Sequence, residues 1–386
     1  MSHFFNPPFC IGSRIRAMKT LTILLLFCLS LTTRVTAQEI VPMDAEHWDV
    51  RAESHVFEKH LGKDAIYLQG GSIFAKNLEF LDGTIEFDIF LKEEQMFPGV
   101  CFRGDAQFMN GEQFFLRPHL SGKPDANQGA PAVNGITPWQ LYFGPSYSFA
   151  YDYKFDDWTH VKVVVNGRQA QAYLDYATEA QLSWNLFHDP QAGSLFIRGG
   201  STAMYIADVR IDPTKPELVD FNPIPRDPIE GVITEWEISD MFEEELLNDP
   251  ANLGPVIEAR SWQGTITVEE GVAANISRIQ VLRNGEPGST VFARIVVTSD
   301  RDQLKLFEFG YSDAVIAILN GTAIYKGNNK WRSRDYRYLG TVGLFDAIYL
   351  DLKRGKNTLL LAVSESFGGW LVTGRFEDTD GLRIEP

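Results

Sequence analysis

The sequence predicts an all-β chain of 386 residues that folds as two consecutive β-sandwiches. Short runs rich in Val, Ile, Phe and Tyr alternate with polar residues, and Gly, Asn or Asp separates one run from the next. A proline-rich stretch interrupts this pattern past the middle of the chain. The length suits two domains of ordinary size, so we expect each half to build its own core from strands.

The N-terminal segment predicts export. Residues 18–37 combine the cationic Lys19, an apolar run and the small-residue end Val35-Thr36-Ala37, which is typical of a cleaved signal peptide. The residues before Met18 fit such a peptide badly, and an upstream start codon would explain them. We therefore expect residues 1–37 to be a signal peptide with this upstream extension, and the mature chain to be secreted or periplasmic. No later stretch reaches the roughly 20 apolar residues of a membrane span, so no transmembrane segment is predicted.

Charge and cysteine content narrow the class of partner. The formal net charge of −16 repels phosphate backbones, which argues against nucleic acid and anionic lipid as partners. A neutral poly- or oligosaccharide is the expected partner.

Cys101 is the one cysteine after residue 37 and cannot form an internal disulfide, so apolar cores must hold the fold together.

Strand and turn patterns recur in both halves. In Thr84–Leu91 the apolar residues alternate strictly with polar ones, which predicts a strand with one buried face. Two hairpins are predicted at Val161–Leu174 and Val315–Tyr325, because Asn166-Gly167 and Asn320-Gly321 tolerate the positive φ angles of a tight turn.

Prolines define the domain boundaries. Residues 213–228 cannot form regular ladder hydrogen bonds and are expected to be a linker between domains at 38–212 and 229–386.

Ser239–Leu247 has the cap residues and the acidic first turn of a short helix. The long segment Met109–Tyr151 is rich in Gly-Pro turns, and long irregular segments in compact domains are often functional. We expect the site to lie there.

The first domain resembles the concanavalin A-like lectin/glucanase sandwiches, including the LamG and 3-keto-disaccharide hydrolase domains. The resemblance rests on a "G-x-I-x-F" strand, a "G-I-x-F-R"-like strand, a Trp-containing strand and a "W-x-x-V-K-x-x-x-N-G" hairpin, at Phe80–Phe90, Gly99–Gly104, Trp139–Phe143 and Asp157–Gly167. It implies a sandwich that binds a glycan or, alternatively, cleaves a carbohydrate as a glycoside hydrolase or related enzyme.

The second domain resembles the galactose-binding-like jelly rolls that accompany bacterial carbohydrate enzymes. The segments on which this resemblance rests are Ile233–Ser239, Phe309–Asp313, Leu319–Gly321, Trp331–Asp335 and Leu352–Leu359. This resemblance implies an accessory binding or packing module. A third reading is a structural or interaction protein of the cell envelope.

Period-two alternation suggests one polar and aromatic face in the first domain. Planar donors and aromatic rings suit sugar hydroxyls and ring faces. The predicted carbohydrate-binding residues are Arg103, Arg117, His119, Gln140 and Tyr142, beside Glu86 and Asp88. The alternative is that the arginines pair with the two carboxylates on an exposed sheet that binds nothing. His119 follows Pro118 and could equally be a loop residue with no role.

Glu86 and Asp88 are the candidate catalytic residues, because glycosidases use two carboxyl groups about 5–10 Å apart. The laminarinase-like branch carries a further acid where this chain has Phe90 and Leu91, so the resemblance does not supply an acid/base residue. Whether the chain is an enzyme stays open. No cofactor and no metal site are predicted, although a structural calcium ion held by backbone and Asp oxygens is left open.

Trp331 and Arg334 are the carbohydrate-binding candidates of the second domain, where aromatic and cationic residues cluster after a turn. The alternative is that Arg334 pairs with Asp335 and that the aromatic rings pack between domains, since aromatic anchors are also typical of interfaces.

Overall fold

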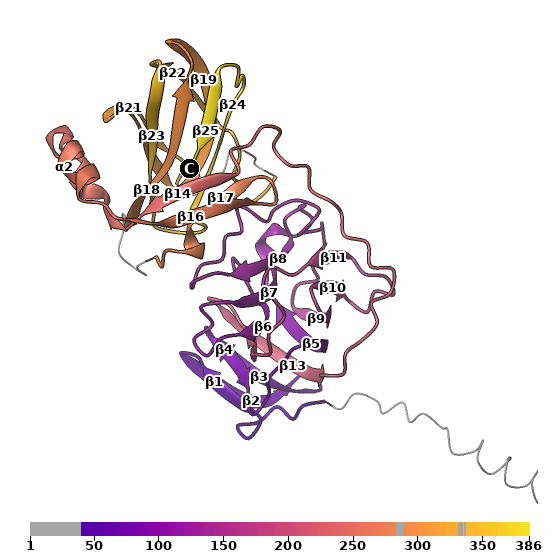
Figure 1. Cartoon of the computed structure of the whole chain (residues 1–386). Coiled ribbons are helices and arrows are strands. Elements are labelled where there is room, and N and C mark those ends of the chain that lie inside the picture. Colours follow the sequence, from indigo (N-terminus) through magenta and orange to yellow (C-terminus); the bar gives the residue numbers. More distant parts are fainter. Residues whose placement is uncertain (1–39, 283–288, 331–334, 336) are drawn as a thin grey trace, which may run out of the picture. The chain divides into compact units, whose positions relative to one another are not determined.

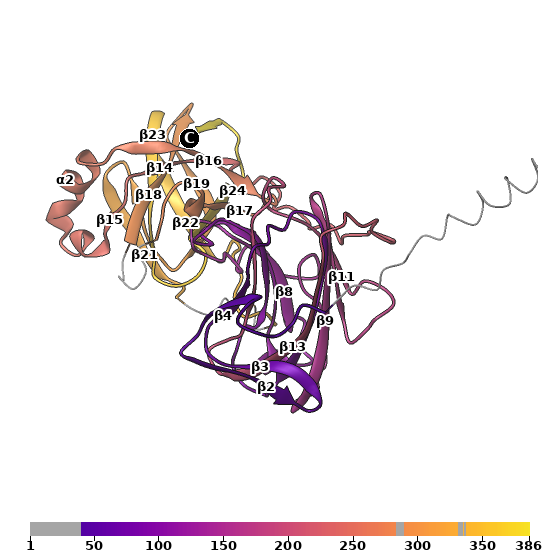
Figure 2. The same ribbon diagram turned by 90° about the horizontal axis from the view of Figure 1, so that it is seen from below.

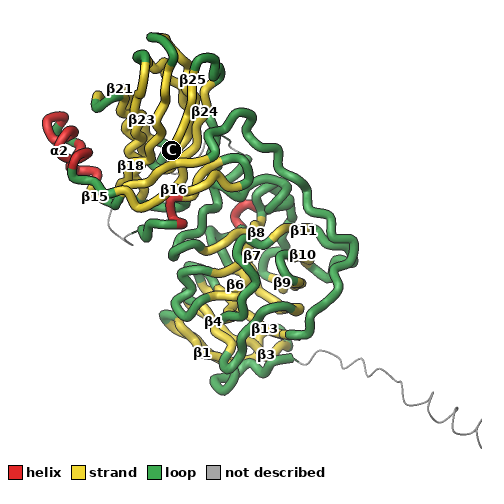
Figure 3. The backbone as a smooth tube through the Cα atoms, in the orientation of Figure 1, coloured by secondary structure: helices red, strands yellow, loops and turns green. Residues whose placement is uncertain are grey.

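The computed structural model describes residues 40–282, 289–330, 335 and 337–386. Within these ranges the chain is almost entirely β, as the sequence predicts, with a few short helices (Figure 3). Strands β1–β13 form the first sandwich and strands β14–β25 the second. Residues 213–228 contain neither a helix nor a strand. None of the helices in the described ranges has the length and apolarity that a membrane crossing needs.

The first sandwich has two antiparallel layers, which can be followed in Figures 1 and 2. One is a six-stranded sheet, in the order β1 (Trp48–Arg51), β4 (Ser72–Ala75), β12 (Ser194–Arg198), β6 (Gly99–Gly104), β7 (Gly111–Leu116) and β8 (Asn127–Ala132). The other is a seven-stranded sheet, in the order β11 (Leu182–Asn185), β10 (Gln169–Leu174), β9 (Asp157–Asn166), β5 (Gly83–Leu91), β13 (Ala203–Asp212), β3 (Lys63–Gln69) and β2 (Ser54–His60).

The core of the first sandwich lies between these layers. Ile85, Phe87 and Ile89 on β5 are fully buried and share one cluster with Phe102 on β6 and Phe114 on β7. The strict alternation in β5 therefore produces the buried face that the sequence predicts. Glu86 and Asp88 occupy intervening positions of β5.

The second sandwich is a continuous set of strands whose two layers join at β16 (Trp262–Glu269), which pairs with β14 (Glu235–Ser239) and with β17 (Ala273–Asn275). Its core contains Trp236, Phe309, Leu361 and Trp370. The remaining strands are β15 (Phe242–Glu243), β18 (Ser289–Ser299), β19 (Gln303–Ser312), β20 (Ala314–Leu319), β21 (Thr322–Asn328), β22 (Asp346–Leu352), β23 (Gly355–Glu365), β24 (Leu371–Phe376) and β25 (Leu382–Glu385).

Helices are short and lie outside the layers. They are η1 (Pro118–Leu120), η2 (Glu244–Leu247), η3 (Pro250–Asn252), α2 (Leu253–Glu258) and η4 (Ile276–Arg278). The helix predicted at Ser239–Leu247 is therefore wrong at its start, because the end of β14 and β15 occupy those residues. Val256 of α2 packs against Phe292 on the outer side of β18.

Both predicted hairpins are present. Asn320 and Gly321 have φ values of +50° and +81° and connect β20 to β21 as a two-residue turn. In the first sandwich the pairing of Asn166 with Gln169 moves the turn by one residue, so that Gly167, with φ of +59°, is its first residue.

Candidate functional site

The predicted face of seven residues does not exist as one surface. Glu86 and Asp88 lie on β5 in the seven-stranded sheet, whereas Arg103 lies on β6 in the six-stranded sheet and Arg117 directly follows β7 of that same sheet. The two sheets pack face to face, so their outer sides point in opposite directions. The expectation that all these side chains converge is wrong, and each group has its own surroundings.

Glu86 and Asp88 enclose a histidine. The Nδ1 atom of His160 donates to Asp88 at 2.6 Å, and its Nε2 atom lies 3.4 Å from Glu86. Burial lowers the pKa of His160, but the hydrogen bonds to the two carboxylates outweigh burial and raise this pKa above its usual value. Hydrogen bonding to His160 in turn holds the pKa of Glu86 below its usual value.

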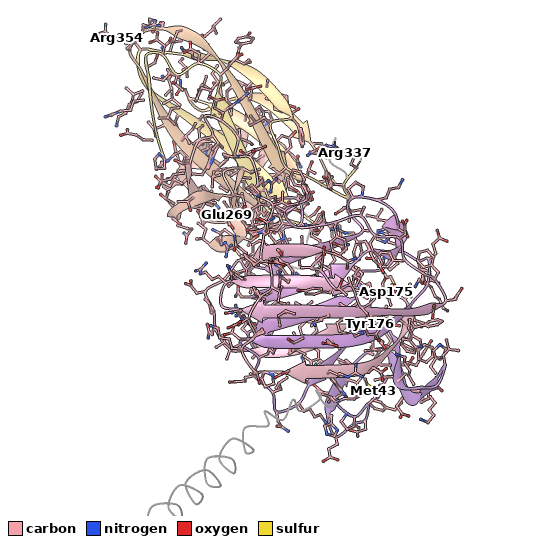
Figure 4. The ribbon with its side chains drawn as sticks, turned by 90° about the vertical axis from the view of Figure 1, so that its right-hand side faces the viewer. Met43, Asp175, Tyr176, Glu269, Arg337 and Arg354 are labelled. Atoms are coloured by element: carbon pink, nitrogen blue, oxygen red, sulfur yellow. The ribbon has the colours of Figure 1, made fainter. Side chains whose placement is uncertain are left out.

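The same cluster also contains a lysine, Lys63, and a tyrosine, Tyr176, whose ring stacks on the histidine. Lys63 donates to Asp88 and, at 2.7 Å, to Asp208. The ring of Tyr176 stacks on the ring of His160 with centroids 3.9 Å apart, although Tyr176 itself is 68% exposed. Figure 4 shows Asp175 and Tyr176 next to each other against the strands of the first sandwich.

This arrangement gives the cluster the character of an ion-pair network. Burial raises the pKa of Asp88, but hydrogen bonds from His160 and Lys63 outweigh burial and lower the pKa overall. Both Glu86 and Asp88 are therefore ionised at neutral pH. A glycosidase needs one carboxyl group that keeps its proton, and neither member of this pair has the required electrostatics.

Arg103 is held by local contacts. Its Nε atom donates to the carbonyl oxygen of Leu81 at 2.6 Å, and its guanidinium pairs with Asp82 at 2.9 Å. Asp82 also accepts from the backbone amide of Gly167 in the β9–β10 turn. Arg103 thus connects a loop to a hairpin, and at 8% exposure little of its side chain is accessible to a ligand.

Gln140 and Tyr142 are buried beneath residues of the second sandwich, within the compact unit 40–386. The Gln140 side-chain oxygen accepts from the backbone amide of Gly369 at 2.9 Å. The Tyr142 hydroxyl donates to the Glu269 carboxylate, and Tyr142 is only 1% exposed. Neither side chain lies on the accessible face that the sequence predicts, because residues 139–143 form a turn instead of a strand. Trp331 and Arg334 lie outside the described residues.

Cys101 is a buried thiol on β6. It is 1% exposed, and burial raises the pKa of the thiol to about 12. We expect Cys101 to resist alkylation by iodoacetamide in the native protein at about pH 8, because the thiolate is the reactive form, and to react once urea unfolds the chain. Peptide mapping by mass spectrometry separates this residue from the other cysteines. Labelling at equal rates in both states would contradict the burial.

Arg117 directly follows the end of β7 and is 1% exposed. Its guanidinium pairs with Asp125 and donates to the side-chain oxygen of Gln128. The Nε atom is buried and has no hydrogen-bond partner among the described residues. The two terminal nitrogens of Arg117 are thus hydrogen-bonded, and its Nε atom is a donor without a partner among the described residues.

A cavity of about 190 Å³ opens beside Arg117. It contains aromatic, cationic and neutral polar side chains, and we call it the β7 cavity. Its lining residues are Gln95, Phe97, Phe115, Arg117, Thr137, Trp139, Arg198, Leu339 and Phe367. The predicted site segment Met109–Tyr151 contributes to this lining, although β7 and β8 fall inside it, so that its irregular parts are the connection between these two strands and the residues after β8.

Aromatic rings and guanidinium groups lie close together in the cavity wall. The guanidinium carbons of Arg117 and Arg198 lie over the Phe115 ring, 5.0 and 5.3 Å from its centroid. The rings of Trp139 and Phe367 are 5.2 Å apart at an angle of 59°. A planar apolar surface next to hydrogen-bond donors is the arrangement that a sugar ring requires.

Two glycines allow the aromatic wall to form. Gly368 has φ of +111°, and a Cβ atom there would lie 2.4 Å from Nε2 of Gln140 and 2.8 Å from the Trp139 ring. A Cβ atom at Gly369 would lie 2.7 Å from the backbone of Pro138. Any larger residue would push Phe367 away from Trp139, so the pair of glycines brings the two rings together.

His119 lies next to the cavity wall without lining the cavity. Its ring meets the edge of Phe97 with centroids 5.3 Å apart. Both ring nitrogens are buried and have no hydrogen-bond partner among the described residues. Burial, assisted by the charge of Arg117, lowers the pKa of His119, so the ring is neutral at neutral pH.

Comparisons with known proteins give fold neighbours of low similarity. No family model matches the sequence, and no curated protein matches it. The carbohydrate-binding module CBM66 from Bacillus subtilis is 16% identical, with a TM-score of 0.33, over 42% of this chain and 93% of that one. SCLam, a non-specific endo-β-1,3(4)-glucanase from family GH16, is 10% identical, with a TM-score of 0.31, over 44% of this chain and 85% of that one. An anti-sigma factor domain-containing protein is 10% identical, with a TM-score of 0.24, over 83% of this chain and 81% of that one.

Sequence reasoning missed several lining residues. Arg198 ends β12, where Leu195 and Ile197 are buried, so alternation alone would have placed Phe196 and Arg198 on the outer face. Phe97 and Gln95 come from the loop before β6 and carry no such signal. In the described ranges no group of three or more His, Cys, Asp or Glu side chains is placed to hold a metal ion.

Proposed function

We propose that this chain is an exported protein that binds a carbohydrate in the β7 cavity. The observation that supports the proposal is a wall that combines the rings of Phe115, Trp139 and Phe367 with the guanidinium groups of Arg117 and Arg198. Ring faces stack on the apolar faces of sugars, and fixed planar donors orient their hydroxyl groups.

The size of the cavity limits the ligand. Pockets for drug-sized molecules have volumes of roughly 300–1,000 Å³, and the β7 cavity, at about 190 Å³, is smaller. It has room for one sugar residue, so we infer recognition of a monosaccharide or a chain end. Extended chains would place their further residues outside the cavity.

Binding is favoured over hydrolysis by the composition of the wall. None of the described residues that line the cavity is Asp or Glu. Glycoside hydrolysis by the usual route needs two carboxyl groups about 5–10 Å apart around the scissile bond. Glu86 and Asp88 lie on the other sheet and are ion-paired there.

Replacing Trp139 with Ala tests the proposal. We expect saccharide affinity to fall by about tenfold or more, because truncating a buried aromatic anchor costs about 2 kcal/mol or more and 1.4 kcal/mol corresponds to tenfold. Isothermal titration calorimetry with a panel of mono- and oligosaccharides measures this change.

The matched control for this experiment is Tyr349→Ala. Tyr349 lies on β22 in the second sandwich, is 70% exposed and does not line the cavity. Its removal should leave affinity unchanged. The proposal fails if no saccharide binds the unmodified protein, or if Trp139→Ala and Tyr349→Ala bind equally well.

A further inference from the structure

The charge of the β7 cavity is opposite to the charge of the protein. The chain has a formal net charge of −16, yet the described residues that line the cavity include two arginines and no carboxylate. Such a local reversal in an acidic protein requires a reason, because it is not what an average surface composition would produce.

The two arginines differ in how their charges are balanced. Arg117 is paired with the buried Asp125. Arg198 donates through Nε to the carbonyl oxygen of Phe97 at 2.8 Å, and no carboxylate among the described residues forms an ion pair with it. The cavity therefore contains one guanidinium whose positive charge the described part of the chain leaves uncompensated.

The position of the Arg198 guanidinium is set by its neighbours. Its Nε atom donates to the carbonyl oxygen of Phe97, and its guanidinium carbon lies over the Phe115 ring, 5.3 Å from the centroid. Among the described residues nothing accepts a hydrogen bond from its two terminal nitrogens, so both are available to a ligand. A guanidinium held in this way presents two parallel N–H donors, which match the two oxygens of a carboxylate.

We propose that the ligand of the β7 cavity is an acidic sugar whose carboxylate is bound by Arg198. The inference rests on the proposed carbohydrate function and assigns the class of sugar. This inference assigns an acidic sugar in place of the neutral saccharide that we expect from the net charge of the chain. The overall negative field does not prevent such binding, because exposed charges are largely screened beyond about 8 Å at physiological ionic strength, and Arg198 is in direct contact.

The test compares glucuronic acid with glucose, which differ only in the group at C6. We expect the unmodified protein to bind glucuronate at least about tenfold more tightly than glucose, with a preference that shrinks as salt is added. Arg198→Gln should remove this preference, so that glucuronate and glucose bind this variant with affinities within about twofold of each other. Arg198→Lys should restore only part of the preference, because an ammonium group cannot donate two parallel bonds.

The matched control is Arg51→Gln. Arg51 lies on β1 of the same sheet and also covers a phenylalanine ring, with its guanidinium carbon 3.9 Å from the Phe74 centroid. It is exposed, pairs with Asp49 and does not line the cavity. This variant should keep the preference for glucuronate. Thermal unfolding of all three variants checks that a lost preference does not reflect a lost fold.

The outcomes separate this inference from the carbohydrate proposal. If glucose binds as tightly as glucuronate and Trp139→Ala weakens both, the carbohydrate proposal stands and the acidic-sugar inference is overturned. If glucose 6-sulfate binds more tightly than glucuronate, the assignment to a carboxylate is overturned. A preference for glucuronate that survives Arg198→Gln also overturns it. If no sugar binds, both proposals fail.

Discussion

Replacing Arg117 with Met is expected to lower the free energy of unfolding by about 3–5 kcal/mol. Arg117 is 1% exposed and Asp125, its partner, is 2% exposed, so the substitution leaves a carboxylate buried without its countercharge. Urea titration of the unmodified and substituted proteins at about pH 7 measures the difference.

The pH dependence of this loss follows from the position of Asp125. Burial raises the pKa of Asp125 even though Arg117 opposes the shift, so removing Arg117 should raise the folded-state pKa further. A carboxyl group with a raised folded-state pKa costs stability as pH rises from its unfolded value toward the folded one. The loss in Arg117→Met should therefore be smallest near pH 4, about the unfolded pKa of Asp, and should grow as pH rises toward the folded-state pKa.

A double substitution shows whether the buried charge is the cause. Arg117→Met with Asp125→Asn removes both charges, and the amide oxygen can still accept from the backbone amide of Leu339, as Asp125 does at 2.6 Å. The double variant should be more stable than Arg117→Met alone. Arg168→Met, which breaks the exposed pair with Asp189, is the control and should change stability little. Equal losses in Arg117→Met and Arg168→Met would contradict the prediction.

The layers of the fold could be predicted because alternation is a local property. In β5 the residues Ile85, Phe87 and Ile89 are fully buried at every second position. Asn320-Gly321 predicts its hairpin for a similar reason, since only the two turn residues need positive φ. Each of these signals is complete within about ten residues of sequence.

The candidate site could not be assembled in the same way. Alternation states whether Glu86 or Arg103 points inward or outward, but it does not state which of two sheets contains the strand. The order β9-β5-β13 in one sheet and β12-β6-β7 in the other is set by pairing between distant segments. A polar face deduced from alternation alone therefore mixes residues from opposite sides of a sandwich.

Contacts over long sequence separations account for the other differences. The Tyr142 hydroxyl donates a hydrogen bond to Glu269 and the Gln140 side chain accepts one from Gly369, so residues far along the chain cover both side chains. The glycines that bring Phe367 to Trp139 look like an ordinary loop in the sequence. Arg198 was within reach of sequence reasoning, since the buried Ile197 directly before it fixes its direction.

Replacing Asp88 with Asn is expected to lower the free energy of unfolding by about 1.5–3 kcal/mol, the value of a hydrogen bond to a charged group. Asp88 is 1% exposed and accepts from both His160 and Lys63. The loss should be smaller than in Arg117→Met, because His160 keeps Glu86 and Lys63 keeps Asp208 as partners.

The size of this loss should depend on pH in a bell-shaped manner. The folded-state pKa of Asp88 is lowered, so its contribution is present above the unfolded value of about 3.9 and disappears as pH falls through the folded value. The folded-state pKa of His160 is raised, so its contribution is complete below about 6.5 and disappears as pH rises through the folded value. The difference between the two proteins should be largest between about pH 4 and 6.5.

Other charged groups face this cluster and limit how far the difference can fall. Lys162 and Arg210 stabilise the charge of Glu86, and Lys63 stays protonated across this range because its pKa is raised. Above the folded-state pKa of His160 the bond between Lys63 and Asp88 persists, so the difference should shrink without vanishing. Urea titrations across this pH range follow the change.

The control for Asp88→Asn is Asp64→Asn on β3. Asp64 pairs with Lys59, but both side chains are exposed, at 75% and 72%, so water replaces the lost bond and the change in stability should be small at every pH. A loss in Asp88→Asn that is equally large at about pH 5 and pH 9 would mean that shape and packing, not charge, hold Asp88 in place. Because a rise in pH removes the charge of His160, whose pKa is raised by its two carboxylate partners, only an ionic network predicts a smaller loss at the higher pH.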